Sequence, residues 1–232
     1  MCGRYTLTAT PGQIVGNFDI GALTFDYFAR FNIAPGQACP VIARDSRGRR
    51  MGLLHWGLIP GWRDEPGPGF INARSESVSE KPSFREAFLR RRCLVPADGF
   101  YEWERREAGD TEPGAVDSSG GKTPHWIYPR AGGVLSLAGV WETWSRPGAT
   151  TRNTFAILTT EASEDVRAIH DRMPVVFDAA RRDVWLARDT APDQLLRLMA
   201  PAPAETFTSH VVSTRVNRVA EDDSALIKPV TG

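Results

Sequence analysis

Short runs of alternating or β-branched residues recur along this chain, and Gly or Pro residues interrupt the sequence between them. Runs of this kind are typical of β-strands. They predict strands at 3–8, 39–44, 52–58, 92–96, 100–104, 126–128, 134–140, 154–160, 175–177 and 210–214. Apolar residues at helical spacing are fewer and predict helices at 11–18, 82–91, 162–168, 179–187 and 192–199. The sequence therefore predicts an α+β fold with a curved, mixed or antiparallel sheet and scattered helices.

The chain length favours one domain. Its 232 residues contain no internal repeat and no linker long enough to divide them, so we expect a single domain over 1–232. Residues 108–123 are rich in Gly, Ser, Asp and Glu and predict a mobile loop between two strands, and a shorter Pro/Gly loop is predicted at 64–69. Hydrophobic residues make up 41% of the chain, which is enough for a sizeable core and excludes wholesale disorder.

Charge and hydropathy restrict the partners. No apolar stretch approaches the roughly 18 residues that span a bilayer, and the N-terminus lacks the basic-then-apolar pattern of a signal peptide. We expect a cytoplasmic monomer without membrane contact. Lys and Arg total 28, as do Asp and Glu, so nucleic-acid binding would have to depend on a local groove. All basic residues except Lys81, Lys122 and Lys228 are arginines, which suit forked phosphate contacts, although a GC-rich genome produces the same bias.

The three cysteines are Cys2, Cys39 and Cys93. An odd number without the spacing of metal ligands, beside four scattered histidines, predicts reduced thiols and no metal. Cys39 and Cys93 are predicted to be inert buried thiols. We expect no cofactor.

Cys2 has a separate chemical interpretation. Cysteine is small enough at the second position for Met1 to be removed, which leaves a free α-amine beside the thiol. Their ordinary pKa values, about 7.7–8.0 and about 8.5, keep both groups partly nucleophilic at neutral pH. Such an aminothiol adds to an aldehyde through nitrogen and closes through sulfur to a thiazolidine, and it can also attack an amide. The alternative is a chance residue at a frayed terminus.

Two aromatic and polar segments suggest a binding surface. In an extended segment Asn72 and Arg74 share one face, which places an amide beside a guanidinium and suits a sugar hydroxyl or a phosphate. Trp62, beside the Pro/Gly loop, is a candidate platform for stacking a base. Trp56 is expected in the core.

Two residues are candidates for proton transfer. In a strand Glu102 shares a face with Phe100, whereas Tyr101 and Trp103 point the other way, so its carboxylate is predicted in a partly apolar pocket that raises its pKa. A surface glutamate is the alternative. His170 precedes polar, turn-favouring residues and an apolar strand, which places it at the edge of an element where it can reach a cleft, although a lone histidine is also often structural.

Six segments, in this order and across nearly the whole chain, resemble the SOS response-associated peptidase (SRAP) family. They are MCGRY at 1–5, RFNIAPG at 30–36, WGLIP at 56–60, NARSE at 72–76, PADGFYEW at 96–103 and HDRMP at 170–174. The resemblance implies a compact α+β fold with a β-barrel-like core. It also implies a DNA-repair enzyme with lyase- or peptidase-like chemistry, whose N-terminal cysteine cross-links covalently to abasic sites in single-stranded DNA. Such a protein would be nucleoid-associated when bound.

The resemblance also implies roles for individual residues. Cys2 is the nucleophile, and Asn72, Glu102 and His170 complete the active site. Arg4, Arg74 and Arg172 contact phosphates, and Trp62 and Trp103 lie near the DNA. The tail at 216–223 departs from the family, because acidic residues follow its Val-Asn pair and argue against a DNA contact there. The acidic insertion at 108–123 is also longer than the family pattern.

Residue chemistry supports this mechanism and leaves alternatives open. An abasic deoxyribose is mostly a closed hemiacetal, so an acid must protonate the ring oxygen, and either Glu102 or His170 can do so. A second class is an N-terminal-cysteine peptidase or amidase, including one that processes itself. A third is a non-catalytic DNA-binding domain in which Cys2 is incidental. The first predicts a heat-stable adduct on abasic DNA with marked salt dependence and little sequence preference.

Overall fold

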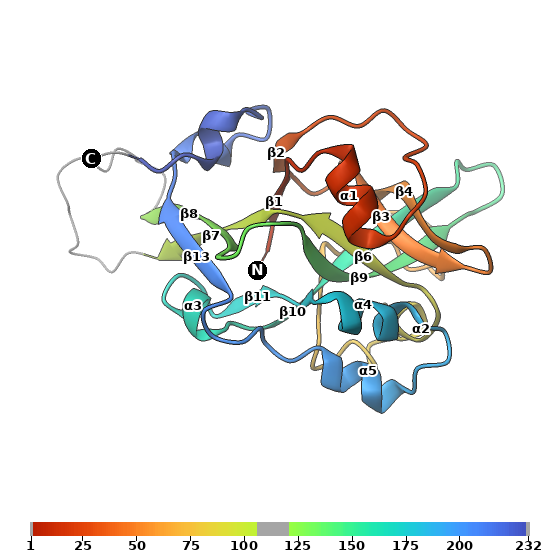
Figure 1. Ribbon diagram of the computed structural model, residues 1–232. Helices are drawn as coiled ribbons and strands as arrows, with labels where there is room; N and C mark the ends of the chain where they lie inside the picture. Colours follow the sequence, from red (N-terminus) through yellow and green to blue (C-terminus); the bar gives the residue numbers. More distant parts are fainter. Residues whose placement is uncertain (1, 106–120, 231–232) are drawn as a thin grey trace.

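The computed structural model describes residues 2–105 and 121–230. Two sheets form its framework (Figure 1). The strands are β1 (Arg4–Leu7), β2 (Arg30–Ile33), β3 (Ala38–Asp45), β4 (Gly48–Trp56), β5 (Asn72–Arg74), β6 (Arg92–Ala97), β7 (Gly99–Arg105), β8 (Lys122–Pro129), β9 (Leu135–Trp144), β10 (Arg152–Glu161), β11 (Arg172–Pro174), β12 (Val176–Phe177) and β13 (Phe207–Val211). The helices are α1 (Pro11–Phe18), α2 (Arg85–Arg90), α3 (Glu164–Arg167), α4 (Ala179–Leu186) and α5 (Pro192–Leu198), with short 3₁₀ helices η1 (Thr214–Asn217) and η2 (Ser224–Ile227).

The larger sheet closes on itself. The strand order is β11-β10-β4-β3-β6-β9-β12. Because β10 pairs with β9 as well as with β4, the path β10-β4-β3-β6-β9 returns to β10 and forms a closed ring. The pairings of β10 with β4 and β5 are parallel, whereas its pairings with β9 and β11 are antiparallel. The smaller sheet has the order β13-β8-β7-β1-β2. The predicted α+β fold with a barrel-like, mixed sheet is confirmed.

Every predicted strand and helix overlaps an observed one, and the differences have local causes. The strand predicted at 210–214 ends at Val211, because Ser213 caps η1 by accepting a hydrogen bond from the Arg215 N–H. Strands β2, β5 and β11 are short, and tertiary pairing creates them. The predicted loop at 108–123 lies, up to residue 120, outside the described residues, and its last two residues begin β8.

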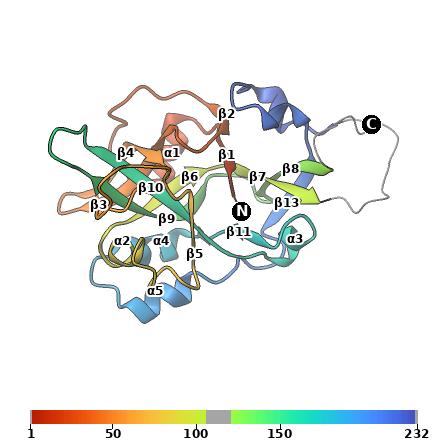
Figure 2. The same ribbon diagram turned by 180° about the vertical axis from the view of Figure 1, so that it is seen from behind.

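Two apolar clusters flank β7. Phe100 belongs to the main core, whereas Tyr101 packs with Val212, Val216 and Leu226 in a smaller cluster under the C-terminal turns. Cys39, Cys93 and Trp56 are buried in the main core, as predicted. Helices α2, α4 and α5 gather on one side of the barrel, and the start of β1 lies near the middle of the molecule beside β7 and β11 (Figures 1 and 2). The N-terminal segment therefore leads into the interior, which corrects the alternative of a frayed terminus. Within the described part, no helix is long and apolar enough to cross a membrane.

Candidate active site

Strand pairing brings four distant segments together. Strand β1 runs antiparallel to β7 with Arg4 opposite Tyr101, so the residues before β1 continue alongside Glu102. Two of the strands that pair with β10 carry site segments. Asn72 of β5 lies opposite Ile157, and Arg172 of β11 lies opposite Glu161. Figure 2 shows β5, β10 and β11 beside the start of β1. The segments of Cys2, Asn72, Glu102 and His170 thus converge on one place.

Two distances define the centre of the site. The Asn72 side-chain nitrogen donates to the Cys2 carbonyl oxygen at 2.9 Å. The His170 Nε2 lies 3.9 Å from a Glu102 carboxylate oxygen. Asn72 Oδ1 is buried and accepts no hydrogen bond from the described residues, so it remains available to a ligand or to the chain terminus. Asn72 therefore holds the backbone of Cys2 while offering an acceptor of its own.

The Cys2 side chain is fully buried. Burial raises the pKa of its thiol well above the ordinary value, and the neighbouring Glu102 charge raises it further. At neutral pH the sulfur is therefore a thiol, and a nearby base has to take its proton when it reacts.

Glu102 is poised between its two protonation states. Its side chain is 2% exposed, and Phe100 on the same face of β7 belongs to the apolar core, as the alternation predicts. Burial raises the pKa of the Glu102 carboxyl to about 7, and the charge of Asp171 contributes to the rise. A carboxyl with this pKa can both donate and accept a proton at neutral pH.

The His170 ring is oriented by the backbone. Its Nδ1 accepts a hydrogen bond from the Arg172 N–H at 2.9 Å. An Asp171 carboxylate oxygen also lies 2.9 Å from Nδ1, but that side chain is 86% exposed and can turn into water, whereas the backbone donor is fixed. Burial lowers the pKa of His170. We therefore assign a neutral ring with its proton on Nε2, the nitrogen that faces Glu102.

The three arginines differ in their surroundings. Arg74 is exposed and forms no ion pair or side-chain hydrogen bond with the described residues. Arg4 donates to Asn32 Oδ1 at 3.0 Å and to the Val216 carbonyl at 2.6 Å, which orients its guanidinium without neutralising it. Arg172 is paired with a carboxylate, because its two terminal nitrogens donate to the two oxygens of Glu76 at 2.6 and 2.9 Å.

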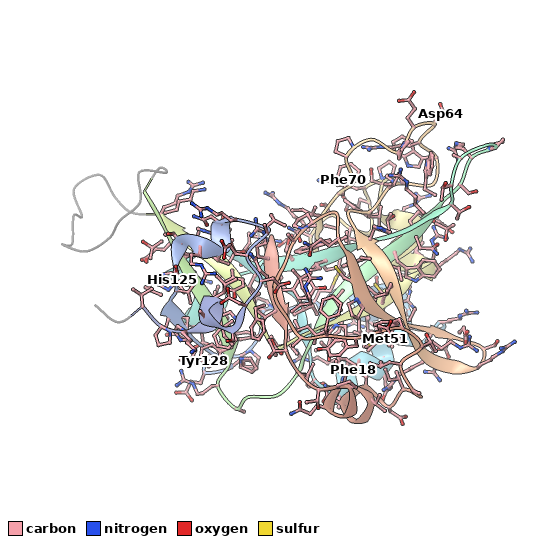
Figure 3. All side chains as sticks on the ribbon, turned by 90° about the horizontal axis from the view of Figure 1, so that it is seen from above. Phe18, Met51, Asp64, Phe70, His125 and Tyr128 are labelled. Atoms are coloured by element: carbon pink, nitrogen blue, oxygen red, sulfur yellow. The ribbon has the colours of Figure 1, made fainter. Side chains whose placement is uncertain are left out.

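The two tryptophans occupy different environments. Trp62 is 61% exposed on the 60–70 loop, at the end of the molecule that Asp64 and Phe70 mark in Figure 3. Arg63 stiffens this loop by donating to the Pro68 carbonyl at 3.0 Å and by lying over the Phe70 ring at 5.0 Å. Trp103 donates to Asn217 Oδ1 at 2.8 Å and packs against the smaller cluster.

The C-terminal turns contribute residues to which sequence reasoning assigned no role. Fully buried Asn32 donates to the carbonyls of Val216, Arg218 and Glu221, at 3.2, 3.1 and 2.8 Å. Asp222 accepts the Phe31 and Asn32 N–H groups and pairs with Arg30. Glu221 and Asp223 both pair with Arg215. Asp222 therefore holds the tail against β2, whereas Glu221 and Asp223 brace the tail internally through Arg215.

Asp98 is another residue that the sequence left without a role. Its carboxylate accepts hydrogen bonds from Thr6 Oγ1 at 2.5 Å, Thr8 Oγ1 at 2.8 Å and the Ala9 N–H at 2.9 Å. These bonds fix the end of β1, the strand that follows Cys2. The motif at 96–103 contains Asp98, but the sequence does not show which groups bind its carboxylate.

A groove of about 940 Å³ opens on the barrel, and none of the four candidate active-site residues lines it. It lies between the end of β4, the 67–69 turn and the start of β10, and Ile71, next to Asn72, lines it. His55, Arg152 and Asn153 supply polar groups there. Within residues 2–105 and 121–230, no group of three or more His, Cys, Asp or Glu side chains could hold a metal ion.

Comparison with known proteins places this arrangement in a family. The family described as SOS response associated peptidase (SRAP) matches residues 1–219. The chain is 36% identical to the abasic site processing protein YoaM of Bacillus subtilis, over 98% of this chain and 97% of the relative. It is 32% identical to the abasic site processing protein HMCES of Gallus gallus, over 88% of this chain and 67% of the relative.

A solved structure shows the same fold. A Bacteroides thetaiotaomicron protein superposes with a TM-score of 0.86 at 21% identity, covering 99% of this chain and 100% of that protein.

Proposed function

The chain belongs to the SOS response-associated peptidase (SRAP) family, and from this we propose that it processes abasic sites in DNA by cross-linking Cys2 covalently to the sugar aldehyde. The observation that carries the proposal is the convergence of Cys2, Asn72, Glu102 and His170, with the Cys2 backbone held by Asn72. The matched relatives are named as abasic site processing proteins, and the four residue types supply what that chemistry requires.

The first step is opening of the sugar ring. The closed hemiacetal opens when its ring oxygen is protonated and the C1′–O4′ bond breaks while the C1′ hydroxyl loses its proton, which yields an aldehyde. Protonated Glu102 is the acid in this proposal, because its pKa of about 7 keeps part of it protonated at neutral pH. His170, neutral with a proton on Nε2, can return a proton to Glu102 or donate to the opened sugar.

The next steps form the adduct. Removal of Met1 frees the Cys2 amine, which adds to the aldehyde carbon, and loss of one water gives an imine. The Cys2 sulfur then adds to the imine carbon, its proton reaching the ring nitrogen by way of Glu102, and a thiazolidine closes. Protein and DNA join with net loss of one water. Asn72 Oδ1, buried and open to a donor, can bind the amine or a sugar hydroxyl.

We further propose that the DNA is single-stranded and that the protein acts as a cytoplasmic, nucleoid-associated monomer. An abasic nucleotide must reach a site whose reacting groups are mostly buried, and a single strand can enter more easily than a duplex. Exposed Arg74 and Trp62 can supply a phosphate contact and a stacking platform for this strand. No net charge attracts DNA from a distance, so these local contacts carry the binding.

The burial of Cys2 separates this proposal from the peptidase alternative. A cysteine peptidase needs a thiolate, and burial raises the pKa of the Cys2 thiol. An aldehyde is attacked first by the amine, so this reaction does not require a standing thiolate. The raised pKa therefore favours aldehyde chemistry over amide hydrolysis.

Incubation with single-stranded DNA containing one abasic site, followed by denaturing electrophoresis, tests the proposal. We expect a heat-stable band. The intact mass of the adduct should equal the mass of the protein without Met1 plus the mass of the DNA minus one water. A tetrahydrofuran analogue, which has no aldehyde, is the matched control and should give no band. Peptide cleavage without a band would support the peptidase, and a shift that denaturation reverses would support a binding domain.

A further inference from the structure

Glu76 and Arg172 form a forked ion pair beside the active site. Each terminal nitrogen of the guanidinium donates to one carboxylate oxygen, at 2.6 and 2.9 Å, and the second nitrogen also donates to the Thr159 carbonyl at 2.7 Å. The Arg172 side chain is only 11% exposed. Glu76 lies four residues after Asn72, so the pair ties the Asn72 segment to β11 and to β10.

The same arginine controls the histidine through its backbone. Arg172 is two residues after His170, and its N–H donates to His170 Nδ1 at 2.9 Å. On the other side of the ring, Nε2 lies 3.9 Å from Glu102. A continuous series of contacts therefore runs from Glu76 through Arg172 and His170 to Glu102. If the fork opened, this backbone donor would lose one of its anchors, and the pairing of β11 with β10 would have to hold it without the fork.

We propose that Glu76 is a positioning residue, which holds Arg172 so that its backbone N–H directs His170 Nε2 toward Glu102. The inference rests on the proposed function insofar as His170 and Glu102 move protons in the abasic-site reaction. It also changes the role that the family resemblance implies for Arg172. A guanidinium with both terminal nitrogens on one carboxylate has little charge left for a phosphate, unlike those of Arg4 and Arg74.

The geometry distinguishes this pair from an ordinary surface ion pair. Exposed pairs contribute about 0–1 kcal/mol and tolerate loss of either partner. Here the arginine is mostly buried and bonds to a β10 carbonyl as well, and its hydrogen bonds to the carboxylate, followed by its charge, lower the pKa of Glu76. The Glu86–Arg90 pair on α2 is the matched contrast, with both side chains more than half exposed.

Single-turnover adduct formation at saturating abasic single-stranded DNA tests the proposal, because saturation removes effects on affinity. We expect Glu76→Ala to slow adduct formation about tenfold, which is a part of the rate enhancement that a positioned acid–base group supplies. Glu76→Gln keeps an acceptor for the fork and should retain most of the rate. The double variant Glu76→Ala/Arg172→Ala should be no slower than Arg172→Ala alone, because one residue acts through the other. Glu86→Ala should match wild type.

Two further readouts separate positioning from folding and from binding. Affinity for tetrahydrofuran-containing DNA should not fall in Glu76→Ala, since a carboxylate has been removed from a phosphate-binding surface. The ring ¹⁵N signals of His170 should show the Nε2–H tautomer in wild type and a mixture of tautomers in Glu76→Ala. Thermal melts identify any unfolded variant, and if Glu76→Ala unfolds, Arg172→Ala, which also removes the fork, should show the slower rate and the mixed tautomers.

Several results would overturn the inference. They are a wild-type rate in Glu76→Ala, a double variant slower than Arg172→Ala, or a loss of affinity for the analogue as large as the loss of rate. If the wild-type protein forms no heat-stable adduct, the proposed function fails instead. The ¹⁵N spectrum then decides the positioning role alone, and unchanged tautomers in Glu76→Ala would end it.

Discussion

Asn32 accepts a hydrogen bond from Arg4 with its side-chain oxygen, while its side-chain nitrogen donates to three carbonyl oxygens of the C-terminal turns. One fully buried amide thus joins β2, the arginine two residues after Cys2, and the end of the chain. Because Asn217 also accepts a hydrogen bond from Trp103, the same turns hold Arg4 and Trp103, two residues for which the family resemblance implies a place at the DNA.

Replacing Asn32 by leucine should therefore affect both stability and DNA binding. It leaves buried carbonyls without a donor, and we expect a loss of about 2–4 kcal/mol in the free energy of unfolding, measured with urea. Binding to abasic-analogue DNA should also weaken, with a smaller dependence on salt, because Arg4 loses its orientation. Gln194→Ala, at an exposed position on α5, is the control. Wild-type stability of Asn32→Leu would contradict the role of the amide.

Glu102→Gln should change the pH dependence of stability in a defined direction. The carboxyl pKa rises from 4.5 to about 7 on folding, so the group favours the folded state below about pH 4.5, and this contribution is lost as pH rises through about 7. A shift of this size corresponds to on the order of 3 kcal/mol. Urea unfolding should show Glu102→Gln gaining stability relative to wild type between pH 4.5 and pH 8. A constant difference across this range would refute the raised pKa.

The same substitution should remove part of the pH–rate profile. If protonated Glu102 opens the sugar ring, wild-type adduct formation declines above pH of about 7, whereas the Gln variant is slow and lacks this limb. Rates of adduct formation at saturating DNA, from pH 5.5 to 9, measure this pH dependence. An identical limb in both proteins would assign the titration to another group.

The three arginines should contribute unequally to the salt dependence of binding. Each phosphate contact to a single strand changes the slope of log affinity against log salt by about 0.7. We expect Arg74→Ala and Arg4→Ala each to make this slope shallower by about 0.7, which corresponds to one phosphate contact. Arg172→Ala should change it little, because Glu76 already neutralises that charge. Fluorescence titrations with the tetrahydrofuran analogue give the slopes, and equal losses in all three variants would show that DNA displaces Glu76.

Arg92→Met should destabilise the protein without altering the site chemistry. The buried guanidinium donates to the Trp185, Phe88, Leu89 and Ala187 carbonyls, at the ends of α2 and α4. Loss of these bonds should cost about 3–5 kcal/mol by urea unfolding. Arg90→Ala, 73% exposed, should cost about 0.5 kcal/mol or less. The adduct rate of folded Arg92→Met should equal that of wild type, and a slower rate would show that these helices influence the site.

The sequence determined the parts of this protein that depend on local order. Residue alternation predicted β7 and the shared face of Phe100 and Glu102, and helical spacing predicted the helix at 11–18, which is α1. Buried Cys39, Cys93 and Trp56 also followed from their neighbours. The motif order identified the family and its four candidate active-site residues, because motifs are local strings of residues.

Only the tertiary structure decided which distant groups meet. The fork between Glu76 and Arg172 joins residues 96 positions apart, and Asn32 meets tail carbonyls more than 180 positions away. No strand was predicted at β2, β5 or β11, and their pairing with β1 and β10 defines them. The pKa of Glu102 likewise depends on how completely the folded chain excludes water from it. Local patterns predict which side chains turn inward, whereas the degree of burial and the long-range pairing are properties of the packed fold.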